Sequence, residues 1–172
     1  MRNIWFSSDP HYDHANILNF KDSDGKRFRG DLFSSVEEMN EVMIERHNSR
    51  VKTGDIWYCG GDVTFKPEKF SRIGCRLNGA KRLILGNHDN PKSLEVMKWF
   101  EKVMIWRLFK DEGFVATHIP ILERNFRHKV KANLHGHEHQ NPTSPPYFSM
   151  CVEHTNYYPL HMDEIVEMIN RV

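Results

Sequence analysis

The chain has 172 residues, of which 39% are hydrophobic and 27% are charged, and its formal net charge is +1. This length and composition favour one globular domain spanning residues 1–172 over a disordered or fibrous chain. The near-neutral charge gives no global field for nucleic acid or a membrane surface, and the apolar runs are too short to span a bilayer. Residues 1–9 lack the apolar core of a signal peptide, so we expect a cytoplasmic location.

The number and spacing of the cysteine and histidine residues indicate different roles for the two residue types. The three cysteines are widely spaced and form no Cys-x-x-Cys pair, which favours reduced core thiols over disulfides or a zinc knuckle. Histidine is abundant, with eleven residues in the chain and three of them within residues 135–139. We therefore expect some histidines to do chemistry.

Strand patterns alternate with helix patterns in the first part of the chain. Ser35 and Glu38 form a capping-box pattern ahead of apolar residues with a helical period, and Pro67 suits the first turn of a helix. In chain order we predict a strand at 3–6, a helix at 35–48, a strand at 55–62, a helix at 67–76, a strand at 81–86 and a helix at 93–103.

Strand patterns dominate the later part. Residues 104–110 and 114–118 flank Asp111-Glu112-Gly113, which is a hairpin signal. Further elements are a strand at 131–136, a Pro-rich loop at 142–146, a strand at 147–154 and a helix at 164–172 that Asp163 precedes. This order favours an α/β (α+β) fold with a mixed sheet or two packed sheets.

Polar side chains follow the predicted strands at the points where the strands end. They are Asp9 and His11, Asp62, Asn87 and His88, His118, and His137 and His139. In the i, i+2 pairs at 9/11 and 137/139, both side chains would point to one side of an extended chain. Ligands of open α/β sheets bind at the carboxyl ends of strands. Carboxylate, amide and imidazole groups without thiolate suit manganese, iron, zinc or nickel.

The same residues match five motifs of a known family in order. They are D-x-H at 9–11, G-D at 61–62, G-N-H-[DE] at 86–89, a single H at 118 and G-H-x-H at 136–139. Each motif alone could be an ordinary polar turn, but all five in order are specific. The chain resembles the calcineurin-like metallophosphoesterase superfamily, as a short single-domain member, over nearly its whole length. The resemblance implies a four-layer αββα sandwich of two mixed sheets flanked by helices.

The resemblance also implies two divalent metal ions. Mn²⁺ is the first expectation, with Zn²⁺, iron or Ni²⁺ as alternatives. One ion would be held by Asp9, His11, Asp62 and His139. The other would be held by Asp62, Asn87, His118 and His137, so that Asp62 bridges the two.

Catalytic and substrate-binding residues are implied less directly. His88 would face the substrate as a catalytic residue, and Asp89 would orient His88. His14, Arg124 and Arg127 lie near the first motif or between the fourth and fifth, and they are candidates for substrate binding. Surface or capping roles are the competing interpretation for these three residues.

The implied reaction is hydrolysis of a phosphate ester by attack of a metal-bound hydroxide, without a phospho-enzyme intermediate. The chain lacks the G-D-x-V-D-R-G run of the superfamily's protein phosphatases and has no room for a capping domain, so we expect an open site and a phosphodiester or nucleotide-like substrate. Phosphomonoesterase or nuclease activity, or a non-catalytic scaffold, are the alternatives. Stable nucleic-acid binding and membrane association are not expected, and a homo-oligomer stays open.

Overall fold

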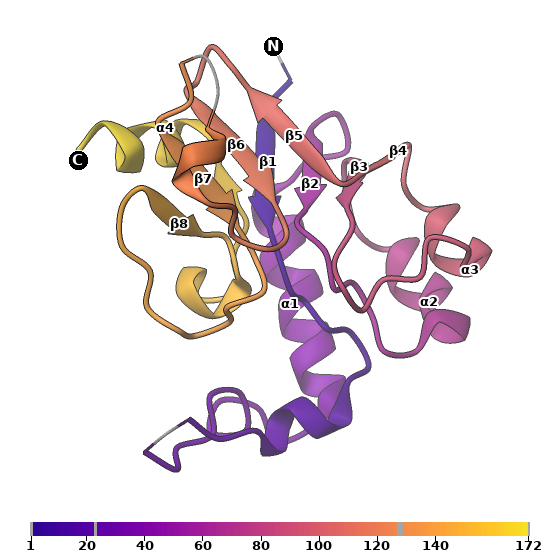
Figure 1. The fold of residues 1–172 in the computed structure, drawn as a ribbon. Coiled ribbons are helices and arrows are strands. Elements are labelled where there is room, and N and C mark those ends of the chain that lie inside the picture. The colour runs from indigo at the N-terminus through magenta and orange to yellow at the C-terminus, as the bar shows by residue number, and fades with distance from the viewer. Residues whose placement is uncertain (1, 23, 127–128, 172) are drawn as a thin grey trace.

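The computed structural model describes residues 2–22, 24–126 and 129–171. Within these residues, two mixed β-sheets and four α-helices form an α+β sandwich (Figure 1), which confirms the predicted fold class. None of the described helices has the length and apolar character needed to cross a membrane.

The first sheet has five strands in the order β4-β3-β2-β1-β9. Their bounds are β1 (Ile4–Ser7), β2 (Ile56–Cys59), β3 (Ala80–Ile84), β4 (Lys102–Met104) and β9 (Leu160–His161). Strands β1 to β4 run parallel, whereas β9 is antiparallel to β1. The carboxyl ends of β1, β2 and β3 therefore lie at the same edge, as parallel strands require.

The second sheet has four strands in the order β5-β6-β7-β8. Their bounds are β5 (Trp106–Phe109), β6 (Phe114–Thr117), β7 (Ala132–His135) and β8 (Tyr147–Ser149). Strands β5 and β6 form the predicted hairpin, while β6, β7 and β8 are parallel. The predicted strand at 147–154 is shorter than expected, because the chain turns into a 3₁₀ helix, η4 (Val152–Thr155).

The four helices are α1 (Val36–Arg50), α2 (Ser71–Gly74), α3 (Leu94–Met97) and α4 (Met162–Asn170). Helix α1 begins where the sequence predicts, because the Ser35 hydroxyl accepts a hydrogen bond from the Glu38 N–H at 3.1 Å. The Glu38 carboxylate completes the cap one residue earlier than expected, by accepting from the Ser34 N–H at 2.7 Å. Both contacts satisfy N–H groups that a helix start leaves without partners.

Two of the predicted helices are wrong in extent. The stretch 67–76 divides into a 3₁₀ turn, η2 (Pro67–Lys69), and the short helix α2. The helix expected at 93–103 ends at Met97, and the chain continues into β4. Strand β4 pairs with the free edge of β3, from Arg82↔Lys102 to Ile84↔Met104. Pairing with that edge overrides the helical period of the local sequence, as tertiary context often does.

The last helix starts before the predicted cap. His161 is the N-cap, since its ring accepts from the Asp163 N–H at 3.3 Å. The Glu164 carboxylate accepts from the His161 N–H at 2.6 Å, which completes a capping box. Asp163 therefore lies inside the first turn, where its negative charge interacts favourably with the helix dipole.

Two hydrophobic cores lie on opposite faces of the first sheet. On one face, Trp57 and Leu83 pack with residues of α1, including Met39 and Met43. The other face packs against the second sheet, which lies in front of β1 and β2 in Figure 1. There the rings of Phe6 and Phe114 meet edge to face at 5.8 Å, and α4 contributes three buried side chains, Met162, Ile165 and Ile169. The shared core fixes the two sheets relative to each other.

Candidate metal centre

Loops from both sheets meet at one edge of the sandwich. The segment after β1 bonds to the segment after β2, with the Asp9 N–H donating to the Gly61 carbonyl at 3.0 Å. In the second sheet, the Gly136 N–H after β7 donates to the His118 carbonyl after β6 at 2.9 Å. The structure thereby brings together all seven side chains that the sequence analysis assigns to metal binding: Asp9, His11, Asp62, Asn87, His118, His137 and His139.

The first group surrounds Asp9. His11 Nε2 lies 3.8 Å from Asp9 Oδ1 and 3.7 Å from Asp62 Oδ2. His139 Nε2 lies 3.9 Å from Asp9 Oδ1. These separations are too long for hydrogen bonds, but ligand atoms that share one ion at about 2 Å lie roughly 3–4 Å apart. The first group therefore has the spacing of a metal site.

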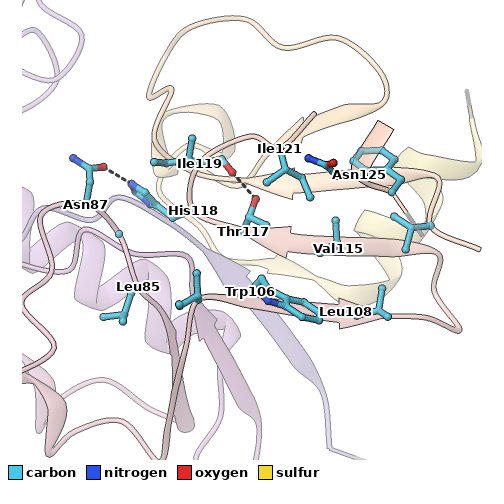
Figure 2. A pocket seen from close by; sticks show the side chains of 14 residues that line it. Leu85, Asn87, Trp106, Leu108, Val115, Thr117, His118, Ile119, Ile121 and Asn125 are labelled. Carbon is cyan, nitrogen blue, oxygen red and sulfur yellow. Dashed lines mark hydrogen bonds between the residues drawn. The ribbon is translucent and has the colours of Figure 1, made fainter. Parts of the chain in front are cut away.

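The second group surrounds Asn87. His118 Nε2 is 2.8 Å from Asn87 Oδ1, a contact shown in Figure 2, and 3.5 Å from Asp62 Oδ2. His137 Nδ1 is 2.9 Å from the same amide oxygen. Asp62 Oδ2 thus faces His11 on one side and His118 on the other. Asp62 Oδ2 is therefore close to both groups.

Buried polar atoms in the first group lack partners. Asp9 Oδ1 and both ring nitrogens of His11 are buried without a hydrogen-bond partner among the described residues. The other oxygen of Asp9 accepts from the Ser8 hydroxyl and from the His137 N–H, so only Oδ1 remains free. An unsatisfied buried polar atom costs about 1–3 kcal/mol. A cation among these atoms would remove that cost, so the donor set fits a metal ion.

The tautomer of His118 also suits metal binding. Its Nδ1 lies 2.8 Å from the Gly60 carbonyl oxygen, which can only accept a hydrogen bond, so Nδ1 carries the proton. Nε2, which lies 2.8 Å from Asn87 Oδ1 and 3.5 Å from Asp62 Oδ2, is then the ring nitrogen that would bind a metal ion. Metal-bound histidines commonly fix their orientation through such a bond from the second ring nitrogen.

The backbone at the ligands is left-handed rather than extended. Positive φ angles occur at Asp9 (58°), His11 (49°), Asp62 (53°), His137 (71°) and His139 (48°). The expectation that the i, i+2 pairs lie on extended chain is therefore wrong. Left-handed conformations cost energy for residues other than glycine, and they concentrate at functional sites where the surroundings impose them. Here they turn the side chains of tight loops toward a common point.

Protonation states also favour metal binding. Burial alone would raise the pKa of Asp9, but the nearby imidazoles of His11, His118 and His139 bring it well below its ordinary value. Burial lowers the pKa of His11 to about 4. At neutral pH the carboxylate is ionised and the imidazole is neutral, which are the forms that bind metals.

The pKa of Asp62, whose carboxylate lies close to both groups, is raised, whereas that of Asp9 is lowered. Burial raises the pKa of Asp62, and the neighbouring carboxylates of Asp9 and Asp89 act in the same direction, while His118 opposes them. Burial and two neighbouring carboxylates thus disfavour the ionised form of Asp62 in the protein alone. A divalent cation beside this residue would relieve the repulsion.

Asp89 does not have the position expected of a residue that orients the His88 ring. Its Oδ2 accepts from the N–H groups of Asp62 and Gly86 at 2.9 and 2.8 Å, and its Oδ1 accepts from the Val63 N–H at 2.9 Å. The carboxylate thus ties the loop after β2 to the loop after β3. Its role here is to hold Asp62 in place through the backbone.

His88 lies at the mouth of the centre. Its backbone N–H donates to Asp62 Oδ1 at 2.9 Å, whereas its side chain is exposed. The ring centroid is 5.0 Å from that of Phe65 and 6.0 Å from that of His11. An exposed imidazole next to the ligands can reach a bound substrate, as the sequence analysis expects.

The three candidate substrate contacts have different outcomes. His14 stacks on Phe65 with centroids 3.8 Å apart, and its ring is 5.5 Å from that of His11, so it borders the centre. Arg124 is exposed on a 3₁₀ turn, η3 (Glu123–Asn125), and the structure does not bring it to the ligands. Arg127 lies outside the described residues.

A buried ion pair supports the centre and was missed by the sequence analysis. Arg29 is fully buried, and its guanidinium donates to Glu153 Oε1 and to the carbonyls of Asp9 and Pro10 at 2.6 and 2.9 Å. The same Glu153 oxygen lies 3.0 Å from His139 Nδ1. The pair thereby orients one ligand ring and the backbone at another ligand. Arg29 and Glu153 are 124 residues apart, so no local spacing could reveal them.

Sequence comparison places the chain in a protein family. No family model matches the chain. The uncharacterized protein MJ1445 of Methanocaldococcus jannaschii is 32% identical over 186 residues, which cover 99% of this chain and 93% of that protein. The chain belongs to the same protein family as MJ1445.

Two further similarities extend over the full length. The Gene 66 protein of Mycobacterium phage D29 is 26% identical over 206 residues, covering 100% of this chain and 98% of its own. The crystal structure of AQ665, a protein of unknown function from Aquifex aeolicus, matches with a TM-score of 0.73 and 26% identity, over 98% of this chain and 100% of that one. The fold is thus shared between this chain and a protein of known structure.

Proposed function

We propose that the protein is a dinuclear metal-dependent phosphoesterase of the calcineurin-like type. The observation that carries this proposal is the group of seven side chains around Asp62. Carboxylate, amide and imidazole groups converge there from five loops, and buried atoms of Asp9 and His11 find no hydrogen-bond partner in the described part of the chain. A structural cluster would be expected to pair these atoms within the protein.

The proposed cofactor is a pair of divalent ions, with Mn²⁺ first and Zn²⁺, iron or Ni²⁺ as alternatives. When bound, the ions supply Lewis acidity and a nucleophile at neutral pH. Asp9, His11, Asp62 and His139 would hold one ion, and Asp62, Asn87, His118 and His137 would hold the other. The site has no thiolate among these ligands, which argues against a soft-metal centre.

The chain's own residues would complete the chemistry. His88, exposed at the mouth, would donate its ring N–H to an oxygen of the phosphate or protonate the leaving ester oxygen, which departs as the alcohol. Asp89 would keep the loop of Asp62 in register through three backbone hydrogen bonds. Glu153, held by Arg29, would orient the His139 ring through its contact with Nδ1.

We favour a phosphodiester or nucleotide-like substrate over a monoester. Asn87 and His88 are both exposed, so one side of the centre opens to solvent. An open mouth accommodates two ester groups on one phosphorus. Monoesterase or nuclease activity at the same residues is the alternative, and a non-catalytic scaffold is the competing class.

The proposal is tested by metal content and turnover together. Protein loaded with Mn²⁺ should carry about two ions per chain by elemental analysis and hydrolyse bis(p-nitrophenyl) phosphate or a 2′,3′-cyclic nucleotide faster than p-nitrophenyl phosphate. His88→Ala should keep its metal and lose about 100-fold or more in turnover, as removal of a general acid does. His154→Ala, which changes an exposed histidine outside the motifs, is the matched control and should behave as wild type.

Three outcomes would contradict parts of the proposal. Absence of bound metal after loading would refute the metal centre. Two ions per chain without turnover of any of these esters would favour the scaffold. Loss of metal in His88→Ala would make His88 a ligand.

A further inference from the structure

An apolar groove opens beside the second group of ligands. It has a volume of about 590 Å³, and Figure 2 shows the side chains that line it. Its walls come from the loop after β3, from strands β5 and β6, and from residues 118–126 and 130. The main apolar side chains are Leu85, Trp106, Leu108, Val115, Ile119 and Ile121. This size is within the range of small-molecule sites.

The groove is continuous with the candidate metal centre. Asn87 and His118 line the groove and also belong to the second group of ligands. Gly86, which precedes Asn87, lines it too. A group bound in the groove would therefore lie directly next to a phosphate bound at the centre.

The groove exposes large apolar side chains to solvent. Trp106 is 58% exposed, Ile119 is 50% exposed and Ile105 is 74% exposed, and all three line the groove. Clustered exposed apolar groups usually mark binding surfaces. The Thr117 hydroxyl is already used, since it donates to the Ile119 carbonyl at 2.8 Å. The described lining thus suits an apolar occupant better than a second phosphate.

We infer that the groove binds an apolar, preferably aromatic, ester group of the substrate, with Trp106 as its main contact. This inference rests on the proposed function, because it takes the phosphate to be held by Asn87, His118 and the ions they bind. It adds a selectivity that the ligands alone do not provide: of two esters with the same phosphate, the one with the larger apolar group should bind more tightly. Apolar area removed from water is the source of the difference.

Binding of two non-hydrolysable phosphonates tests the inference without turnover. Phenylphosphonate and methylphosphonate carry the same anionic group and differ in apolar area. Titration calorimetry on the Mn²⁺-loaded protein should give about tenfold tighter binding of phenylphosphonate, as burial of most of a phenyl ring predicts. On protein loaded with diamagnetic Zn²⁺ instead, the indole N–H resonance of Trp106, assigned with Trp106→Phe, should shift more with phenylphosphonate than with methylphosphonate.

Variants assign the preference to the groove. In Trp106→Ala the preference should fall to about twofold or less, whereas metal content and methylphosphonate affinity should stay unchanged. Trp106→Phe should retain most of the preference. Leu94→Ala is the matched control, because Leu94 is 80% exposed on α3 and does not line the groove. Ile119→Ala, whose preference should also fall, replaces Trp106→Ala if that variant unfolds early.

Each alternative result is distinct. Equal affinities of wild type for both phosphonates would overturn this inference and leave the proposed function standing. Binding of neither phosphonate to fully loaded protein would overturn the proposed function, and this inference with it. Equal affinities together with a wild-type dimer that Trp106→Ala converts to a monomer would assign the groove to a second copy of the chain.

Discussion

Two glycines set how closely the loops of the metal centre approach each other. A Cβ atom at Gly86 would lie 2.1 Å from Asp62 Oδ1, and one at Gly136 would lie 2.4 Å from Asp9 Oδ2. Neither distance is sterically possible, so only glycine lets these loops touch the carboxylates. At the scale of single residues, the small ones are as important to the geometry as the ligands.

Gly86→Ala tests this point at the shared carboxylate. The added methyl group would displace Asp62, so we expect at least about tenfold weaker Mn²⁺ binding and a stability loss of about 1–3 kcal/mol. Metal titration and denaturant unfolding measure the two effects. Gly54→Ala is the matched control, because a Cβ there meets nothing within 4 Å. Unchanged metal affinity in Gly86→Ala would contradict the close approach.

His47 gives a pH prediction away from the centre. It is buried against Trp57, and its Nε2 lies 3.0 Å from the Asn78 carbonyl. Burial lowers the pKa of His47 from 6.5 to about 4. In the unfolded chain His47 is protonated as the pH falls below about 6.5, whereas in the folded chain it stays neutral down to about pH 4. Stability from this residue is complete above pH 6.5, falls as the pH drops, and levels off below about 4.

His47→Gln isolates this contribution, since glutamine does not titrate and retains an N–H donor. Between pH 7 and 4, wild type should lose on the order of 2–3 kcal/mol more unfolding free energy than the variant. Urea unfolding at a series of pH values measures the difference, and other histidines cancel in the comparison. Parallel pH curves for the two proteins would show that His47 does not titrate in this way.

At the scale of elements, the sequence predicts the strands that carry the site better than the helices around them. The strands at β1, β2, β3, β6 and β7 are short apolar runs followed by polar motifs, and each lies where the sequence predicts it. The helix predicted at 93–103 ends early, at Met97, because residues Lys102–Met104 pair with the edge of β3 as strand β4. Strand β9 has two residues and is set by its pairing with β1, which no local pattern could reveal.

In the candidate site, too, local motifs predict some features, whereas others depend on the fold. Its seven candidate ligands were predictable because each motif is local and the carboxyl ends of parallel strands converge. The role of Asp89 was not predictable, since it depends on which backbone N–H groups the fold brings to its two oxygens. Left-handed backbone at residues other than glycine, as at His137, also depends on the surrounding structure.

At the scale of the whole molecule, metal binding should stabilise both sheets together. Asp9 and Asp62 follow strands of the first sheet, whereas His118 and His139 follow strands of the second. Each Mn²⁺ site at about 100 times its dissociation constant should add about 2.7 kcal/mol, or roughly 5–10 °C in Tm. Thermal unfolding with Mn²⁺ and with a chelator measures this shift. The shift should vanish in Asp62→Ala, and an equal shift in that variant would place the ion elsewhere.

The buried pair of Arg29 and Glu153 has an evolutionary consequence. Losing one partner would leave an uncompensated charge inside the protein, at a cost of about 3–5 kcal/mol, whereas replacing both by apolar residues can be neutral. Natural substitutions at position 29 should therefore be accompanied by substitutions at position 153. A homologous chain that lacks the arginine is expected to lack the glutamate as well, and to hold the histidine at position 139 by another route.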